Sequence, residues 1–252
     1  MNPALAVTFL AVAGLLAGIV GTAGGITSLI SYPALLAVGI APFAANVTNV
    51  VSFIGGGVSS TLASRTELRE HRVGLQAMAV VATIGGAAGA ALLLATPPGV
   101  FAWIVPFLIA SAGALLLVQP RVTVWHRSRD RPAPRSLMLM VLGVISVYGG
   151  YFGAGSGVLV LAVVLVLVDA DLVRANAVKN VLVTASVVIP VIVYAAAGPV
   201  TWWAAVPLAT GATVGGVLGP RVTRRMPPRL LRTAVALMGF GLAGWLVAQE
   251  IG

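Results

Sequence analysis

The sequence predicts an all-α polytopic membrane protein made of two inverted repeats of about five hydrophobic segments each. Apolar residues make up 59% of the chain, charged residues only 8%, and the mean hydropathy is +1.06, whereas a soluble domain carries roughly 25% charged residues. Glycine-rich breaks interrupt long apolar runs at matching places in the two halves. The basic residues gather in short stretches between apolar runs. The first observation predicts the class, and the other two predict the repeat and its inversion.

Ten apolar segments follow one another along the chain. A helix needs about 20 apolar residues to cross a hydrocarbon core of about 30 Å. The second and seventh segments are shorter, so we expect half-helices or re-entrant hairpins there, and eight to ten membrane segments in total. Irregular backbone at membrane depth is tolerated only where it is buried in protein or lines a cavity. The segments are 3–20, 25–40, 44–64, 74–95, 99–118, 136–153, 157–168, 175–197, 201–219 and 231–248.

The basic residues indicate which loops share a side of the membrane. If the chain starts outside and crosses at every segment, all 15 Lys and Arg residues fall on the inner side. Cytoplasmic loops of membrane proteins carry the excess of Lys and Arg, so we expect the basic loops to be cytoplasmic. The predicted outer loops carry no Lys or Arg; they are 40–43, 96–98 and 198–200.

The two halves are expected to form one transmembrane domain with opposite orientations. Because each half has an odd number of segments, the second half begins on the opposite side of the membrane and is inverted relative to the first. Fusing each glycine-broken pair into one span would put the arginines of 221–232 opposite those of 65–72, which the positive-inside rule rejects. Repeat one covers 1–118, repeat two covers 136–252, and the basic segment 119–135 links them.

Composition excludes several classes of function. The net charge of +9 does not indicate nucleic-acid binding, because membrane orientation explains the basic loops. The chain has no Cys and no Gly-x-x-x-x-Gly-Lys-Ser/Thr motif, which removes thiol chemistry and ATP hydrolysis. No carboxylate lies in a predicted span, and both His residues lie in basic loops. We therefore expect no enzyme, no metal and no cofactor.

The glycine breaks at 18–25 and 150–157 are candidate anion sites. A helix that restarts at membrane depth presents unpaired N–H groups and the positive end of its dipole, about half a charge. Small residues at four-residue spacing also let helices pack closely, and this is the alternative interpretation. Duplication of the break at matching positions favours a transporter site. The candidate residues here are Thr22, Gly24, Gly25, Gly155 and Ser156.

Amide-rich helix starts follow each break and supply further candidates. In each half, these residues are three or four positions apart and share one helix face; they are Asn46, Asn49, Asn176, Lys179 and Asn180. Lys179 is the only lysine in the chain, and an intramembrane cation indicates function by default. It would bind the anion or supply a titratable charge for coupling to protons. A lysine that snorkels to the interface is the alternative, and both interpretations stay open.

Three charged residues precede the second amide cluster. Asp171 is expected to be the N-cap of the following helix, and Arg174 a loop charge, because Asp is a favoured N-cap. A gating salt bridge made from Asp169, Asp171 and Arg174 is the alternative.

These residues carry a family resemblance. In the first half, the glycine break is followed by Pro33 and Gly39 and then by Ala45-Asn46-Val-Thr-Asn49. In the second half, the break is followed by Arg174-Ala-Asn-Ala-Val-Lys-Asn180. The pattern resembles the two repeats of the TauE/SafE family of sulfite exporters over nearly the whole chain. The family often has a threonine–serine pair where this chain has Val47-Thr48-Asn49, a difference that bears on the substrate.

The resemblance implies a multi-pass transporter in the cytoplasmic membrane of a prokaryote. Together with the motifs, it predicts a secondary, alternating-access transporter for a small anion, sulfite or a related organosulfur or organic anion. A scaffold or partner subunit without transport of its own is the alternative. Coupling to a proton or ion and a homo-oligomer are both compatible with the sequence, and the other expected partner is the lipid bilayer.

Overall fold

A computed structural model describes residues 2–25, 27–68, 72–127, 134–169 and 171–223, together with 233, 237, 240, 241, 243 and 244. All regular secondary structure in these ranges is helical. The predicted segment 231–248 lies almost wholly outside the described residues. The helices are α1 (Pro3–Gly24), α2 (Ser28–Ala37), α3 (Pro42–Ser52), α4 (Ile54–Ala63), α5 (Arg72–Ala95), α6 (Pro98–Arg127), α7 (Arg135–Tyr151), α8 (Ser156–Leu167), α9 (Leu172–Ala197) and α10 (Trp202–Thr223).

The prediction of an all-α polytopic membrane protein is confirmed. Three helical stretches are long and apolar enough to cross a membrane: Pro3–Gly21, Gly74–Ala95 and Leu172–Ala197. Their outward surfaces carry large exposed apolar side chains such as Leu5 and Ile192. A bundle whose outer surface is apolar is suited to a lipid environment.

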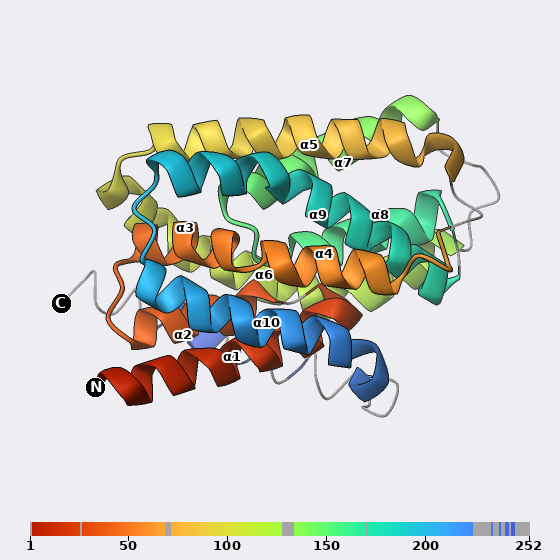
Figure 1. The fold of residues 1–252 in the computed structure, drawn as a ribbon. Helices are drawn as coiled ribbons and strands as arrows, with labels where there is room; N and C mark the ends of the chain where they lie inside the picture. The colour runs from red at the N-terminus through yellow and green to blue at the C-terminus, as the bar shows by residue number, and fades with distance from the viewer. Residues whose placement is uncertain are drawn as a thin grey trace.

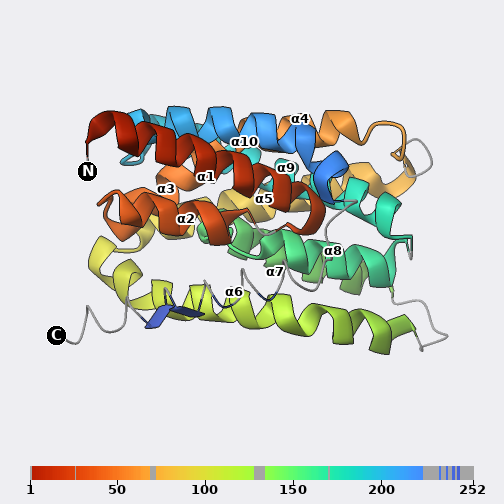
Figure 2. The same cartoon turned by 90° about the horizontal axis from the view of Figure 1, so that it is seen from below.

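The helices lie roughly parallel, and the connections sort to two ends of the bundle (Figure 1; Figure 2). One end, on the left in Figure 1, holds the start of α1 and the α2–α3, α5–α6 and α9–α10 connections. The opposite end holds the last residues of α4, α6, α8 and α10 and the first residues of α5, α7 and α9. The described arginines belong to this second end, which we call the basic end; they are Arg65, Arg72, Arg121, Arg127, Arg135, Arg174 and Arg221.

The two glycine breaks form helical hairpins that enter the bundle from opposite ends. The chain runs toward the basic end along α1 and turns back along α2 (Figure 2). It leaves the basic end along α7 and returns to it along α8 (Figure 1). The second and seventh segments therefore run antiparallel to the helices that precede them, and their re-entry into the membrane stays a prediction.

Two helix boundaries differ from those predicted. The segment 44–64 is not one helix, because α3 and α4 separate at Phe53, whose N–H bonds to Val50 O at 3.3 Å in a tighter turn. Glycines 55–57 follow this break, and glycine weakens a helix. At the other boundary, α6 continues through the first half of the predicted linker 119–135. The first arginine marks the edge of the apolar region rather than the end of the helix.

Glycine faces hold together helices from different halves. At Gly14 and Gly18 of α1, an added Cβ would overlap backbone atoms of α10, and at Gly211 of α10 it would overlap α1. The same relation joins α5 and α7, where a Cβ at Gly89 would overlap Val147 O. Close backbone approach through small residues is the common mode of helix packing in membranes. Gly18 therefore contributes to close helix packing.

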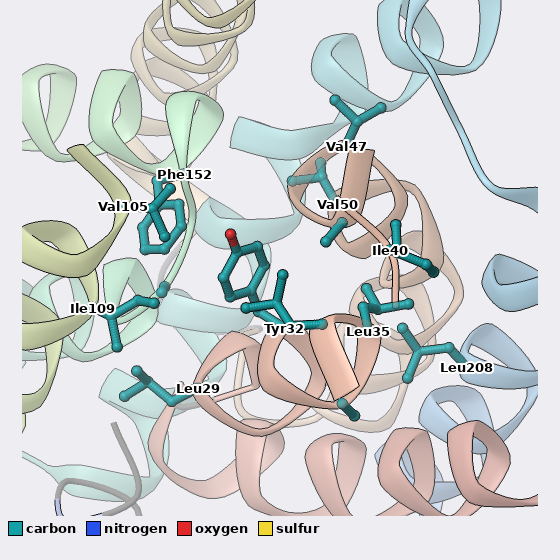
Figure 3. Packing of buried hydrophobic residues seen from close by; sticks show 14 of the residues in the cluster. Leu29, Tyr32, Leu35, Ile40, Val47, Val50, Val105, Ile109, Phe152 and Leu208 are labelled. Atoms are coloured by element: carbon teal, nitrogen blue, oxygen red, sulfur yellow. The ribbon is translucent and has the colours of Figure 1, made fainter. Parts of the chain in front are cut away.

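A large apolar cluster surrounds α2 and fixes its position (Figure 3). Tyr32 of α2 lies at its centre, with its ring edge-on to Phe152 at a centroid distance of 5.5 Å. Leu35 and Leu29 of the same helix are buried against the surrounding helices. A second cluster packs α8 against α5, α7 and α9. Each returning arm is therefore enclosed by protein, as irregular membrane backbone requires.

The sidedness of the two ends can be tested by cysteine labelling, because the chain has no native Cys. We expect Gly99→Cys and Arg65→Cys to react with an impermeant maleimide from opposite sides of oriented vesicles. Both residues are exposed, and an added Cβ at Gly99 meets no atom within 4 Å. Labelling of both from the same side would contradict the arrangement of the helices.

Candidate functional site

Each hairpin tip is shaped by glycines in the left-handed conformation. Gly25 ends α1 with φ 71° and donates its N–H to Gly21 O at 2.8 Å. In the other tip, Gly153 and Gly155 have φ 81° and 77°, and α8 begins directly afterwards at Ser156. A residue with a side chain adopts these dihedrals only with strain, whereas glycine adopts them freely.

The two tips touch inside the bundle. A Cβ added at Gly157 would lie 2.7 Å from Gly25 Cα, and one added at Gly25 would lie 2.5 Å from the Gly157 carbonyl carbon. The breaks therefore meet, and their hairpins come from opposite ends of the bundle (Figure 1; Figure 2). Each tip holds the end of one helix and the start of another, so two helix N-termini, those of α2 and α8, come together.

A cavity of about 110 Å³ lies at this meeting point. Measured in this way, a single water needs roughly 10–15 Å³, so the space suits a small ion or several waters. The wall contains many glycines and a few hydroxyl and amide groups. The residues that line it are Gly18, Gly21, Gly25, Thr27, Ser28, Asn49, Val50, Phe53, Gly56, Gly57, Ser60, Gly149, Gly153, Ser156, Gly157, Lys179, Asn180, Val183, Thr184, Val187 and Gly216.

Lys179 is the charged residue of this wall in the described part of the chain. Its side chain is only 2% exposed. The Nζ donates to Gly21 O at 3.3 Å, which links α9 to the end of α1. A snorkelling lysine would place its ammonium in water, so the structure favours the interpretation of Lys179 as a buried intramembrane cation.

The other predicted amide residues divide into two groups. Asn49 and Asn180 line the cavity; the Ser31 hydroxyl lies 2.5 Å from Asn49 Oδ1, and Asn180 Nδ2 lies 3.3 Å from Ser64 Oγ. Asn46 and Asn176 are not among the described lining residues. The Asn46 amide instead donates to Tyr151 O at 2.9 Å.

The candidate residues of the glycine breaks also fall into different groups, and only some of them line the cavity. Gly25 and Ser156 line the cavity, and the Ser156 hydroxyl donates to Gly153 O at 2.8 Å. Gly155 faces α6 instead, because an added Cβ would lie 3.1 Å from Ala112 Cβ. Gly24 is the last residue of α1, and its surroundings lie outside the part of the chain that is described. The side chain of Thr22 lies outside the part of the chain that is described.

Several lining residues were not predicted. Thr27 is the N-cap residue of α2, and Ser60 of α4 and Thr184 of α9 also line the cavity. A weak signal existed for Thr184, which follows Asn180 by one helical turn, and its hydroxyl donates to Asn180 O at 2.7 Å. For α4, the sequence signal was the run of glycines at 55–57.

The charged residues before α9 form a small network at the basic end. Arg174 pairs with Asp169, with Nε–Oδ2 at 2.7 Å and Nη2–Oδ1 at 3.2 Å. Asp171 is the N-cap of α9 and accepts the N–H groups of Val173 and Arg174 at 3.1 and 2.9 Å. The N-cap prediction is confirmed. Arg174 is paired rather than a solitary loop charge, and a gating role for the pair stays a prediction.

The cap and gate interpretations of Asp171 predict different results. We expect Asp171→Ala to lower the free energy of unfolding by about 1 kcal/mol, the usual loss for an N-cap, and to leave flux per folded molecule within twofold. Asp171→Asn is the matched control, because Asn caps helices equally well. Thermal unfolding and flux are measured on the same preparations. A large flux loss at unchanged stability would instead indicate a gate.

The described residues contain no group of three or more His, Asp or Glu that could hold a metal ion. What they do contain is a polar cavity with a buried cation, enclosed by broken helices in an apolar bundle. This is the architecture of a membrane transporter.

Sequence comparison gives the family. The sulfite exporter TauE/SafE family matches residues 8–246, and the chain belongs to this family of membrane transporters. It is 27% identical over 240 residues to a Haemophilus influenzae protein named "Probable membrane transporter protein", covering 94% of this chain and 92% of the relative. It is 26% identical over 241 residues to "Probable membrane transporter protein YfcA" of Escherichia coli K12, covering 94% and 88%. No solved structure shows a significant match.

Proposed function

We propose that this protein is a secondary transporter that binds a small anion, sulfite or a related organosulfur or organic anion, in the cavity between the two hairpin tips. The observation that carries the proposal is the burial of Lys179 in the wall of that cavity. An ammonium in the wall of a small cavity attracts an anion, and the attraction is strong where water is excluded.

The helix starts at the tips favour the same ligand. Each helix N-terminus carries about half a positive charge, although some of the first N–H groups already bond within the tips: Ile30 N–H to Thr27 O at 3.1 Å and Ser156 N–H to Gly153 O at 3.2 Å. Ser28 and Ser156 stand at these two starts, and both line the cavity. Two positive helix ends and one ammonium thus converge on one small space. An oxyanion matches this set of donors.

Alternating access is supported by the way the halves pair. The first predicted segment of each half packs against the fourth predicted segment of the other half: α1 lies on α10 and α7 lies on α5. This exchange is what an inverted repeat would produce, and in such proteins one repeat rocks against the other around a central site. We propose that the basic end faces the cytoplasm, following the positive-inside rule.

Transport by purified protein in liposomes tests the proposal. The panel contains sulfite, methanesulfonate, taurine, acetate and sulfate, each at an imposed concentration gradient. We expect saturable flux of at least one sulfur-containing or organic anion, above protein-free liposomes by tenfold or more. Binding of a partner protein without flux of any anion would favour the scaffold alternative.

A further inference from the structure

The C-terminal end of α1 binds a cationic side chain of the protein itself. Gly21 O accepts the Gly25 N–H at 2.8 Å and the Lys179 ammonium at 3.3 Å. The last carbonyls of a helix carry about half a negative charge. In transporters with broken helices, such carbonyls coordinate the coupling Na⁺ or H⁺. The Lys179 ammonium therefore lies where a coupling cation would otherwise bind.

The corresponding end of α7 is also covered by protein donors, but these are neutral. Tyr151 O accepts the Asn46 amide at 2.9 Å, and Gly150 O accepts the Tyr194 hydroxyl at 2.7 Å. Asn46 Oδ1 is a buried acceptor without a hydrogen-bond partner in the described part of the chain. A single amide oxygen is too few ligands for an alkali cation, which needs several oxygens. At both helix ends, carbonyls of the described residues thus already accept a hydrogen bond from a side chain of the protein.

The charge of the cavity wall also disfavours a mobile cation. Among the described lining residues there is no carboxylate to hold one, and Lys179 is the charged group present. A Na⁺ ion placed in the same small space would be repelled by the ammonium, and the repulsion is strong where water is excluded. A protein that binds a cation together with its substrate would need a negatively charged group in this wall.

We propose that Lys179 is a built-in counter-cation that takes the place of a coupling ion, so that the anion is carried without Na⁺ or protons. This inference rests on the proposed transport function. Because the ammonium is tethered to α9, it returns with the protein at the end of each cycle. The complete cycle therefore moves only the charge of the anion, and net transport of a monoanion is driven by the membrane potential.

Flux of ³⁵S-labelled methanesulfonate, a monoanion, is the first measurement, followed by any other anion that the panel shows to be carried. The potential is clamped with K⁺ and valinomycin. We expect the initial rate to change less than twofold when choline replaces Na⁺ or when a protonophore removes the pH gradient. The ratio of the anion concentrations on the two sides of the membrane should rise tenfold for each increase of about 60 mV in membrane potential, as expected for a monovalent ion at equilibrium.

A second measurement tests the position of the ammonium. We expect Lys179→Ala to lose flux and to regain at least a tenth of the wild-type rate in millimolar methylammonium, which can donate to Gly21 O. Tetramethylammonium is the matched control, because it has the same charge but no hydrogen to donate. Equal effects of the two cations would place the ammonium elsewhere and contradict the inference.

The two proposals fail in different ways. Absence of flux for every anion under every gradient would refute the proposed function. Flux that is present but stops when Na⁺ is removed, or that follows the proton gradient at a clamped potential, would overturn the built-in counter-cation and leave the transport function standing.

Discussion

Replacing Lys179 with glutamine is expected to lower anion flux at least about thirtyfold. Removing one partner of a buried, hydrogen-bonded charge pair costs roughly 2–5 kcal/mol of binding free energy, and about 1.4 kcal/mol is a factor of ten. Glutamine keeps a hydrogen-bond donor near Gly21 O but removes the charge that faces the cavity. The measurement is the initial rate in proteoliposomes over a range of substrate concentrations.

Arg65→Gln is the matched control for this substitution. Arg65 is exposed in the turn after α4 at the basic end, so the variant loses the same charge without touching the cavity. We expect its flux to stay within twofold of wild type. Both variants should unfold at temperatures close to that of wild type. Arg65 is exposed, and removing the buried ammonium of Lys179 relieves a desolvation cost. Wild-type flux in Lys179→Gln would remove this residue from the site.

Much of the fold could be predicted because its signals are local. The apolar runs and the loop arginines indicate helices and sidedness without any knowledge of their contacts. The glycine breaks were readable for the same reason, since positive φ at Gly25 and Gly155 requires glycine whatever surrounds it. The contact between Gly25 and Gly157 depends on how the helices pack, and the structure shows it directly.

The candidate site could be predicted only in part, because the rotation of each helix about its axis decides which of its residues line the cavity. Asn46 and Asn49 are three residues apart and both buried, yet one caps the end of α7 and the other lines the cavity. Residues at this spacing differ by about 60° around a helix, which is enough to separate two environments. The place of Ser60 and Thr184 in the wall depends on where α4 meets α9, which local sequence signals do not specify.

Lys179 shows most clearly what only the structure decides. Its position near the start of an apolar helix fits a snorkelling lysine and a buried one equally well. The choice depends on its acceptor, Gly21 O, which lies 158 residues away in the sequence. Contacts of this range follow from the packing of α9 against the tip of α1, and no local pattern encodes them.

Gly157→Ala is expected to impair both folding stability and flux, because the added methyl group meets backbone atoms. The new Cβ would lie 2.7 Å from Gly25 Cα and 3.0 Å from Gly25 O, and neither atom can rotate away as a side chain would. Overpacking of this kind costs about 1–3 kcal/mol, although alanine is favoured over glycine in a helix by up to about 1 kcal/mol. The hairpin tips would separate and the cavity between them would change shape.

Gly143→Ala in α7 separates this steric effect from the general effect of adding a methyl group to a membrane helix. Its Cβ would meet only Val81 Cγ1, at 3.5 Å, an ordinary van der Waals distance. We therefore expect Gly143→Ala to keep wild-type flux and an equal or higher unfolding temperature, and Gly157→Ala to lose at least tenfold in flux and to unfold at a lower temperature. Thermal unfolding in detergent and flux in liposomes are measured for both. If the two variants behave alike, the tips do not touch in the working protein, and the cavity between them is not the transport site.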